Sequence, residues 1–195
     1  MAESTEKTAR KMIPLSEQVL LGALDVWGAN GEQHFIPVSG SSMLPLIQDG
    51  DQALVRHGVS GIQCGDLVVF RQQGKMVVHR VLQINPQANG PTFLIKGDNN
   101  LSVDPPVEAE EIVGRVLLIK RGEKILATNT YPWRMAGRAI AWGTLAGFWL
   151  YRRGGSIKRR WLGTQSNFLT RFFRGLWQTS ASFMLGLLKW LLTGR

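Results

Sequence analysis

Between residues 34 and 128 the chain alternates short apolar runs with polar breaks. The runs are rich in Val, Ile and Phe, and the breaks contain Gly, Asn, Asp and Pro. Such runs are typical of β-strands, and Gln73-Gly74-Lys75 is short enough for a hairpin turn. Many short strands at this spacing indicate an all-β sandwich or barrel. Strands are expected at 34–38, 52–56, 66–72, 75–84, 92–96, 112–121 and 124–127.

The segment before the strands has a helical pattern instead. Its apolar residues recur at helical spacing between Leu15 and Ala29, so a short amphipathic helix is expected there. The longest uncharged stretch in it, from Gln18 to Leu24, is too short for a membrane span or a signal-peptide core. Residues 1–12 are polar and charged, and we expect a loose lead-in.

Charge divides the chain into two unequal parts. Residues 1–130 contain 12 Lys/Arg and 14 Asp/Glu, whereas residues 131–195 contain 11 Lys/Arg and no acid. The net charge of +9 therefore comes from the last third, which also holds six of the seven Trp. Within it, residues 139–151 and 175–188 carry no charge. Both runs are shorter than the roughly 18–20 residues that span a bilayer.

Three interpretations fit this basic, aromatic stretch of residues 131–195. An anionic membrane surface accepts Trp and Phe at its interface and Lys/Arg at its phosphates. Nucleic acid contacts Arg through phosphate and stacks on aromatic rings. A helical hairpin would simply pack on the β domain. The uncharged runs make nucleic acid unlikely, and on the membrane interpretation the β domain should stay folded when residues 131–195 are removed.

The segment from Val38 to Pro45 holds a candidate nucleophile, Ser42, in the order Val-Ser-Gly-Ser-Ser-Met-Leu-Pro. An activated hydroxyl needs an exposed sharp turn, where backbone N–H groups can face the oxyanion that it creates. Gly40 permits such a turn, and Pro45 stops a helix from continuing. Taken alone, the segment is more typical of a Ser/Gly loop between strands.

Two later segments supply the partners that a hydroxyl nucleophile needs. His79 lies in a strand-like run, and an imidazole ionises near neutral pH. Asp98 and Asp104 follow the next run, and a carboxylate can orient the imidazole. Alone, His79 is more typical of a half-buried core or surface His, and Asp98 fits an Asx-turn equally well. Ser, His and Asp in this order indicate a nucleophile assisted by a general base.

Four motifs carry a resemblance to a known family. They are Gly-x-Ser-Met-x-Pro at 40–45, Gly-Asp-x-Val-x-Phe at 65–70, Val-His-Arg-Val at 78–81, and Lys-Gly-Asp-Asn-Asn at 96–100 with a later Asp. Over roughly residues 34–121 this set resembles the type I signal peptidases. It is most similar to the endoplasmic-reticulum and archaeal branch, in which a His replaces the Lys base of most bacterial members.

The resemblance implies a serine endopeptidase that cleaves signal or leader-like peptides and uses no cofactor. It implies Ser42 as nucleophile, His79 as base and Asp104 as the acid that orients the base, with Asp98 structuring the site. The backbone N–H of Ser42 is the natural oxyanion donor, and the second donor stays open. The substrate would be an extended peptide or precursor protein.

The implied fold is mainly β, the coiled β fold of signal peptidases and LexA-type repressors, with a basic helical tail at the C-terminus. The expected parts are a lead-in with a short helix (1–33), a signal peptidase-like catalytic β domain (34–128) and a basic, Trp-rich tail that associates with membranes (129–195). The family usually carries a membrane anchor ahead of the Ser motif, and none is visible in residues 1–33. Because Lys/Arg-rich segments tend to stay in the cytosol, the cytoplasmic face of a membrane is favoured.

Two other functional classes stay open. One is a LexA-type regulator that cleaves itself or is inactive, although the 33 residues before His34 leave room for barely one helix. The other is a non-catalytic module that binds a membrane surface. A metal site is not expected, because the three His and the single Cys64 lack ligand spacing. Cys64 is expected to be a packing residue.

Overall fold

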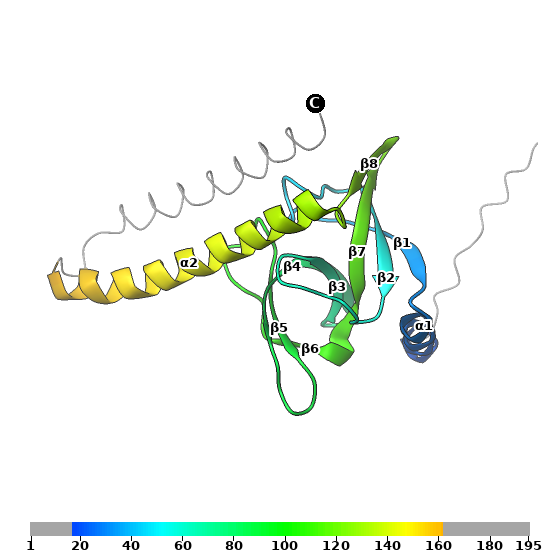
Figure 1. The fold of residues 1–195 in the computed structure, drawn as a ribbon, viewed down its shortest axis with the longest axis horizontal. Helices are drawn as coiled ribbons and strands as arrows, with labels where there is room; N and C mark the ends of the chain where they lie inside the picture. Colours follow the sequence, from blue (N-terminus) through cyan, green and yellow to red (C-terminus); the bar gives the residue numbers. More distant parts are fainter. Residues whose placement is uncertain (1–16, 162–195) are drawn as a thin grey trace, which may run out of the picture.

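The structure of the chain is a computed structural model that describes residues 17–161. A helix, a β region and a second helix follow one another along the chain (Figure 1). The elements are α1 (Glu17–Asn30), β1 (Gln33–Pro37), β2 (Gln52–His57), β3 (Leu67–Gln72), β4 (Lys75–Asn85), β5 (Thr92–Lys96), β6 (Val107–Glu108), the 3-10 turn η1 (Ala109–Glu111), β7 (Ile112–Arg121), β8 (Lys124–Ala127) and α2 (Tyr131–Trp161).

The strands form a single antiparallel sheet in the order β1-β2-β7-β3-β4-β5-β6, with β8 paired to β7. β7 therefore joins the β1–β2 pair to the β3–β4–β5 part. The register shifts between β2 and β7, between β3 and β7 and between β4 and β5. Such irregularities bend strands and increase their twist, in keeping with the curled sheet in Figure 1. This mainly β architecture with a C-terminal helix confirms the expected fold class.

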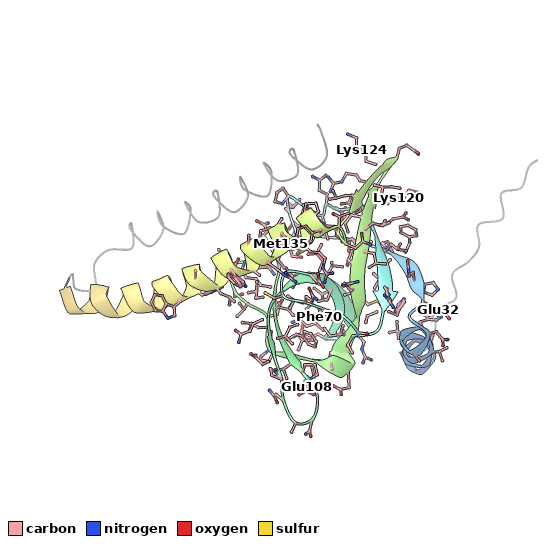
Figure 2. The ribbon with its side chains drawn as sticks, viewed as in Figure 1. Glu32, Phe70, Glu108, Lys120, Lys124 and Met135 are labelled. Carbon is pink, nitrogen blue, oxygen red and sulfur yellow. The ribbon has the colours of Figure 1, made fainter. Side chains whose placement is uncertain are left out.

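β3 is buried on both faces because its alternate side chains enter two different apolar clusters. Leu67 and Val69 belong to the first cluster, and Val68 and Phe70 belong to the second. All four are at most 3% exposed, and Figure 2 shows Phe70 in the middle of the β domain. The first cluster also contains Met43, Leu46 and Ile47 of the Ser42 segment, and the second contains Val81 of β4. Both segments that carry candidate chemistry are thus attached to the core.

The strands lie where the alternation of apolar and polar residues predicted them, within one residue at either end. β6 was not expected, because two residues are too few to show a period. α1 ends one residue beyond the expected helix, and its expected first residues, 15 and 16, lie outside the described part. The loose lead-in expected at 1–12 also lies outside it.

The first turns of α2 pack into the core of the β domain. Trp133 is 7% exposed and belongs to the first apolar cluster, and Ile140 and Ala141 are buried further along the helix. Gly137 approaches Gly65 so closely that a Cβ on Gly137 would lie 2.5 Å from the Gly65 carbonyl oxygen. The first turns of the segment that was expected to be a tail therefore pack on the sheet.

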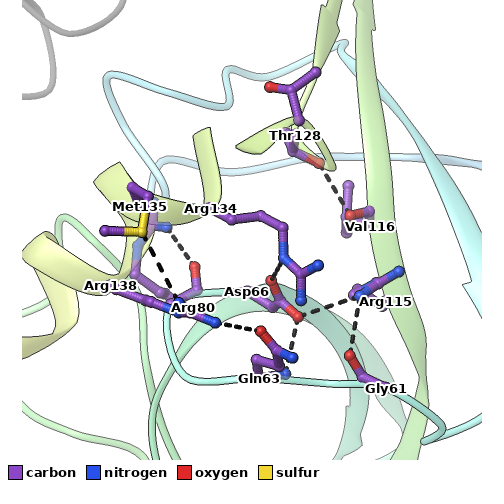
Figure 3. A network of polar contacts seen from close by, with 12 residues as sticks. Gly61, Gln63, Asp66, Arg80, Arg115, Val116, Thr128, Arg134, Met135 and Arg138 are labelled. Carbon is purple, nitrogen blue, oxygen red and sulfur yellow. Dashed lines mark hydrogen bonds and ion pairs between the residues drawn. The ribbon is translucent and has the colours of Figure 1, made fainter. Parts of the chain in front are cut away.

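A polar network around Asp66 joins α2 to the sheet (Figure 3). The Asp66 carboxylate accepts a hydrogen bond of 2.9 Å from the Gln63 N–H. It also lies 3.5 Å from Arg115 Nη1 in β7 and 3.8 Å from Arg134 Nε in α2. One turn later in α2, Arg138 donates to the Gln63 side chain. Two guanidinium groups thus offset the charge of this buried carboxylate, which links α2 to β7.

The far half of α2 extends beyond the sheet (Figure 1).

Exposed apolar side chains follow one face along α2. They recur at helical spacing and are between 44% and 77% exposed: Tyr131, Met135, Trp142 and Trp149. One face of α2 therefore presents apolar side chains to solvent. No helix among residues 17–161 is long and apolar enough to cross a bilayer. The second uncharged run, 175–188, lies outside the described residues.

Candidate active site

The Ser42 segment is anchored by the apolar residues that follow the serine. Met43, Leu46 and Ile47 are at most 2% exposed, whereas Ser41 is exposed and Ser42 is half-buried. Burial of these three side chains stabilises the turn and leaves Ser42 near the surface. Gly40 just before it has a φ of 98°, which is a conformation that Gly adopts readily.

Asp51 and Arg121 anchor the Ser42 segment to the sheet. The Val38 N–H donates to the Asp51 carbonyl oxygen at 2.8 Å. Arg121 donates from Nε and Nη2 to the two Asp51 carboxylate oxygens at 2.7 and 2.6 Å, and from Nη2 to the Leu46 carbonyl oxygen at 3.0 Å. The hydrogen bond to Asp51 raises the pKa of Arg121. A bidentate, charge-assisted pair of this kind is strong, and it holds the segment against β7.

A second turn, at residues 97–100, binds the Ser42 segment from the other side. The Asn99 N–H donates to the Ser42 carbonyl oxygen at 2.8 Å, and Asn99 Nδ2 donates to the Ser41 carbonyl oxygen at 3.1 Å. The Asp98 N–H lies 3.4 Å from Met43 Sδ. A Cβ on Gly97 would lie 2.8 Å from the Ser42 carbonyl oxygen, so only Gly fits there without a shift. Two motifs far apart in sequence thus form one unit.

His79 is buried in β4. One of its ring nitrogens makes a hydrogen bond, and the other makes none with residues 17–161. Its side chain stands opposite Val68 of β3 and packs on Phe70, with ring centroids 5.8 Å apart. Nδ1 lies 2.6 Å from Asp104 Oδ2. Nε2 is buried and has no hydrogen-bond partner among residues 17–161. Asp104 is held by its own backbone, whose N–H donates to the Ile95 carbonyl oxygen at 2.9 Å.

Asp98 contacts Arg80 instead of His79. Arg80 donates from Nε and Nη2 to the two Asp98 carboxylate oxygens at 2.8 and 2.6 Å. Its Nη1 donates to the Gly65 carbonyl oxygen at 2.9 Å. Both side chains of the pair are at most 5% exposed. The pair therefore connects the turn at 97–100 to β4 and to the residue that α2 contacts.

Lys96 is a buried cation beside these two carboxylates. It is 8% exposed, lies opposite Arg80 in the β4–β5 pairing, and donates from Nζ to the Gly97 carbonyl oxygen at 3.0 Å. Burial lowers the pKa of Lys96, and the charges of Asp98 and Asp104 oppose that shift. Lys96, Asn99 and Arg121 were not among the candidates from sequence. Lys96 and Asn99 lie in the motif at 96–100, but only the structure shows which groups they contact.

The structure thus places His79 and Asp104 in one contact group, and Ser42 and Asp98 in a second group built around the turn at 97–100. His79 and Asp104 touch directly, and Asp98 joins the turn at 97–100 to the neighbour of His79. Ser42 joins the same turn through its carbonyl oxygen. Because His79 Nε2 has no partner among residues 17–161, its ring is not hydrogen-bonded to the Ser42 hydroxyl in this structure.

The other two histidines lie elsewhere, between α1, β1 and β2. The rings of His34 and His57 are 5.2 Å apart, and Trp27 packs on both. Within the described part of the chain, no group of three or more His, Cys, Asp or Glu side chains could hold a metal ion. Cys64 is half-buried, and its Sγ donates to the Leu82 carbonyl oxygen at 2.9 Å.

Sequence comparison assigns the chain to a class of proteins. The family model "Peptidase S24-like" matches residues 2–117, more than half of the chain, and the chain belongs to this family. It is a serine-type peptidase.

Named relatives point to the signal peptidases within that class. The chain is 30% identical over 123 residues to the signal peptidase complex catalytic subunit sec11 of Penicillium rubens, covering 56% of this chain and 70% of that protein. It is 30% identical over 133 residues to SEC11C of Homo sapiens, covering 58% and 69% respectively. With SEC11 of Yarrowia lipolytica the identity is 36% over 74 residues, or 37% and 43% of the two chains. The resemblance to signal peptidases is thereby confirmed.

Proposed function

We propose that this protein is a serine endopeptidase that cleaves signal or leader-like peptides, with Ser42 as nucleophile, His79 as base and Asp104 as the group that orients the base. The observation that carries the proposal is the buried His79 ring, whose Nδ1 lies 2.6 Å from Asp104 while Nε2 has no partner among residues 17–161. A general base needs this arrangement, with one nitrogen held and the other available for a proton.

The reaction begins when the Ser42 hydroxyl attacks the scissile carbonyl carbon and its proton passes to His79 Nε2. Asp104 keeps the other ring proton on Nδ1 and stabilises the imidazolium that forms. The Ser42 N–H donates to the developing oxyanion. His79 then gives its proton to the leaving amine. Water, with His79 again as base, releases the acyl group from Ser42 and restores the enzyme.

Asp98 has a supporting role in this proposal. Its carboxylate is fully engaged by Arg80, and its turn binds Ser41, Ser42 and Met43. Asp98 therefore holds the nucleophile segment next to β4 and does not take part in proton transfer. The relatives are named as catalytic subunits of the signal peptidase complex. By analogy, we infer that the substrate is an extended precursor segment with small residues before the cleaved bond.

The test is cleavage of a signal-peptide substrate by the purified full chain, with Ser42→Ala as the blank. We expect cleavage by the wild type only, and a Ser42 acyl adduct visible by mass spectrometry when the substrate is an ester. Equal turnover by wild type and blank would reject the enzyme assignment. Cleavage of the chain itself without turnover of the peptide would favour the alternative, a self-cleaving regulator of the LexA type.

We also propose that residues 131–195 bind an anionic membrane surface, with the cytoplasmic face favoured by their Lys/Arg. These residues carry 11 cations and no acid, and the exposed face of α2 adds Tyr131, Met135 and Trp142. Aromatic side chains among cations suit the headgroup layer, where each cation contributes about 1 kcal/mol.

Vesicle co-sedimentation of the full chain tests this second proposal. We expect binding to anionic vesicles at low salt, weaker binding at high salt, and little binding to neutral vesicles. Trp142→Ser should weaken binding, whereas Phe35→Ser, at another exposed aromatic position on β1, should not. Failure of the full chain to bind anionic vesicles would reject the membrane assignment and favour packing.

A further inference from the structure

Three arginines gather around one carboxylate where α2 joins the sheet (Figure 3). Arg115 of β7 lies 3.5 Å and Arg134 of α2 lies 3.8 Å from the Asp66 carboxylate. Arg138 of α2 donates to the side chain of Gln63, whose N–H donates to Asp66. We call these five residues the Asp66 network. Among residues 17–161, Asp66 is the only carboxylate that pairs with any of its arginines, so the network has a surplus of two positive charges.

Much of the hydrogen-bonding capacity of these guanidinium groups is unused. Each guanidinium has five N–H donors. The Nε atoms of Arg115 and Arg134 are buried and have no hydrogen-bond partner among residues 17–161. The two side chains are still 17% and 29% exposed, so part of each faces solvent. An anion with several oxygens can accept from more than one of these N–H groups at once.

The charge of the network favours a phosphate monoester as that anion. A phosphate monoester carries about −1.5 to −2 at neutral pH, which matches the surplus, whereas a carboxylate brings only a single negative charge. The planar fork of a guanidinium also fits phosphate oxygens in pairs. The nearby Arg80 is not available, because Asp98 occupies it.

The position of the network on α2 favours a lipid as the carrier of the phosphate. Arg138 lies three residues from Met135 and four from Trp142, so it borders the exposed apolar face of the helix. Its Nη1 lies 3.9 Å from Met135 Sδ. A phosphate bound here would have exposed apolar side chains directly beside it. A phospholipid offers both halves of the complement, a phosphate and an apolar body, whereas a free phosphate would leave Met135 and Trp142 in water.

We infer that the Asp66 network binds the phosphate monoester headgroup of a lipid. The membrane as the source of that lipid rests on the membrane binding proposed above. Because Arg115 belongs to β7 and the other two arginines belong to α2, a bound headgroup would contact both elements. The β domain itself, and not only the basic segment after it, would then touch the bilayer.

The first experiment compares two kinds of anionic vesicle. The full chain is co-sedimented with phosphatidylcholine vesicles that contain either phosphatidic acid, a phosphate monoester, or cholesteryl hemisuccinate, a carboxylate, at matched surface charge. We expect half-maximal binding to phosphatidic acid vesicles at about tenfold lower lipid concentration, because charge-assisted hydrogen bonds to the phosphate are added to the general attraction. The ratio of the two lipid concentrations is the preference for phosphate. It cancels any change in overall charge.

Four variants locate the source of this preference. Arg134→Gln and Arg138→Gln should reduce the ratio to near one. Arg138 pairs with no carboxylate among residues 17–161, so Arg138→Gln should stay folded even if Arg134→Gln does not, and thermal melting checks both. Lys124→Gln, which removes an exposed cation of β8 outside the network, should keep the ratio (Figure 2). Trp142→Ser should weaken binding to both vesicles and keep it too. An unchanged ratio in folded Arg138→Gln would overturn the inference.

The second experiment needs no membrane. The melting temperature of the full chain is measured with dihexanoyl phosphatidic acid below its micelle concentration and with glycerol 3-phosphate. We expect the short lipid to raise the melting temperature of the wild type but not of Arg138→Gln, and glycerol 3-phosphate to act much less. An equal rise with glycerol 3-phosphate would assign the network to free phosphates and overturn the lipid. A larger rise with a single-stranded oligonucleotide, lost in Arg138→Gln, would overturn it in favour of nucleic acid.

The two experiments also separate the network from the proposed membrane binding. If the chain binds no vesicles but the short lipid still raises the melting temperature through Arg138, the membrane proposal fails and the lipid phosphate site stands. If the chain binds anionic vesicles without preference for phosphatidic acid and the short lipid has no effect, membrane binding stands and the site is rejected.

Discussion

Gly137 of α2 lies directly against Gly65, the residue two positions before β3. A Cβ on Gly137 would stand 2.5 Å from the Gly65 carbonyl oxygen, and the same oxygen accepts a hydrogen bond from Arg80. Helix and sheet therefore pack backbone to backbone at this point. Arg80 in turn holds Asp98, whose turn binds the Ser42 segment. The docking of α2 is thus connected to the candidate active site through a few buried contacts.

Substitution of Gly137 should lower the free energy of unfolding. Gly137→Ala places a methyl group against the Gly65 backbone, which cannot move aside cheaply, and we expect a loss of about 1–3 kcal/mol in the free energy of unfolding. Gly143→Ala is the matched control in the same helix, since nothing lies within 4 Å of a Cβ there. It should stabilise by about 0.5–1 kcal/mol. Urea unfolding measures both, and equal effects would contradict the close packing.

Truncation gives a second prediction. It differs from the expectation, made on the membrane interpretation, that the β domain stays folded when residues 131–195 are removed. A chain that ends at residue 130 loses Trp133, Ile140 and the Arg134 contact to Asp66, so its β domain should bind a hydrophobic dye and melt at lower temperature. A chain that ends at residue 161 keeps all of these contacts and should melt like the full chain. If the shorter chain melts unchanged, α2 adds nothing to the fold.

Much of the fold follows from local sequence patterns, and the docking of α2 does not. The strands could be placed to within a residue because most of the apolar runs are bounded by Gly, Pro, Asn or Asp. The contact between Gly65 and Gly137 depends on the absence of two side chains far apart in sequence. No period or composition marks it. For the same reason, the sequence predicted a C-terminal helical segment but left open whether it packs on the β domain; the structure shows that its first turns do.

Asp104→Asn should mainly lower the rate of cleavage, whereas Asp98→Asn should mainly lower the stability of the fold. Asp104→Asn keeps the shape at His79 but favours the wrong ring tautomer, so we expect kcat to fall about 10³–10⁴-fold with little change in melting temperature. Asp98→Asn leaves the buried Arg80 without its anion and should cost about 3 kcal/mol of stability. Peptide cleavage and urea unfolding on both variants test this. The reverse pattern would assign the orienting role to Asp98.

The motifs brought these residues to notice, but their contacts could not be deduced from spacing. Asp98 and Asp104 are six positions apart and both match the pattern. Only the folded chain separates them, because the side chain of Asp98 meets Arg80 while that of Asp104 reaches His79. Arg80 and His79 are neighbours in β4, so their side chains point to opposite faces of the strand. The roles assigned to the two carboxylates stay predictions until the variants are measured.

The last prediction concerns His57, a buried histidine away from the site. It is 4% exposed, and both ring nitrogens lack hydrogen-bond partners among residues 17–161. Burial lowers the pKa of His57 and the nearby His34 lowers it further, while the charge of Glu32 partly opposes the shift. Folding therefore favours the neutral ring.

The sign of the pH dependence follows from this lowered pKa. Above the ordinary value of 6.5 both the folded and the unfolded chain hold a neutral His57, and its contribution to stability is fully present. As the pH falls through 6.5, the unfolded chain takes up a proton that the folded chain resists, so stability declines until the lower folded pKa is reached. The free energy of unfolding from urea titrations should thus drop between about pH 7.5 and 6. His57→Phe keeps a ring against Trp27 and should flatten the pH dependence, whereas His34→Gln, at a half-buried position, should leave most of it. An unchanged slope in His57→Phe would mean that His57 does not carry the effect.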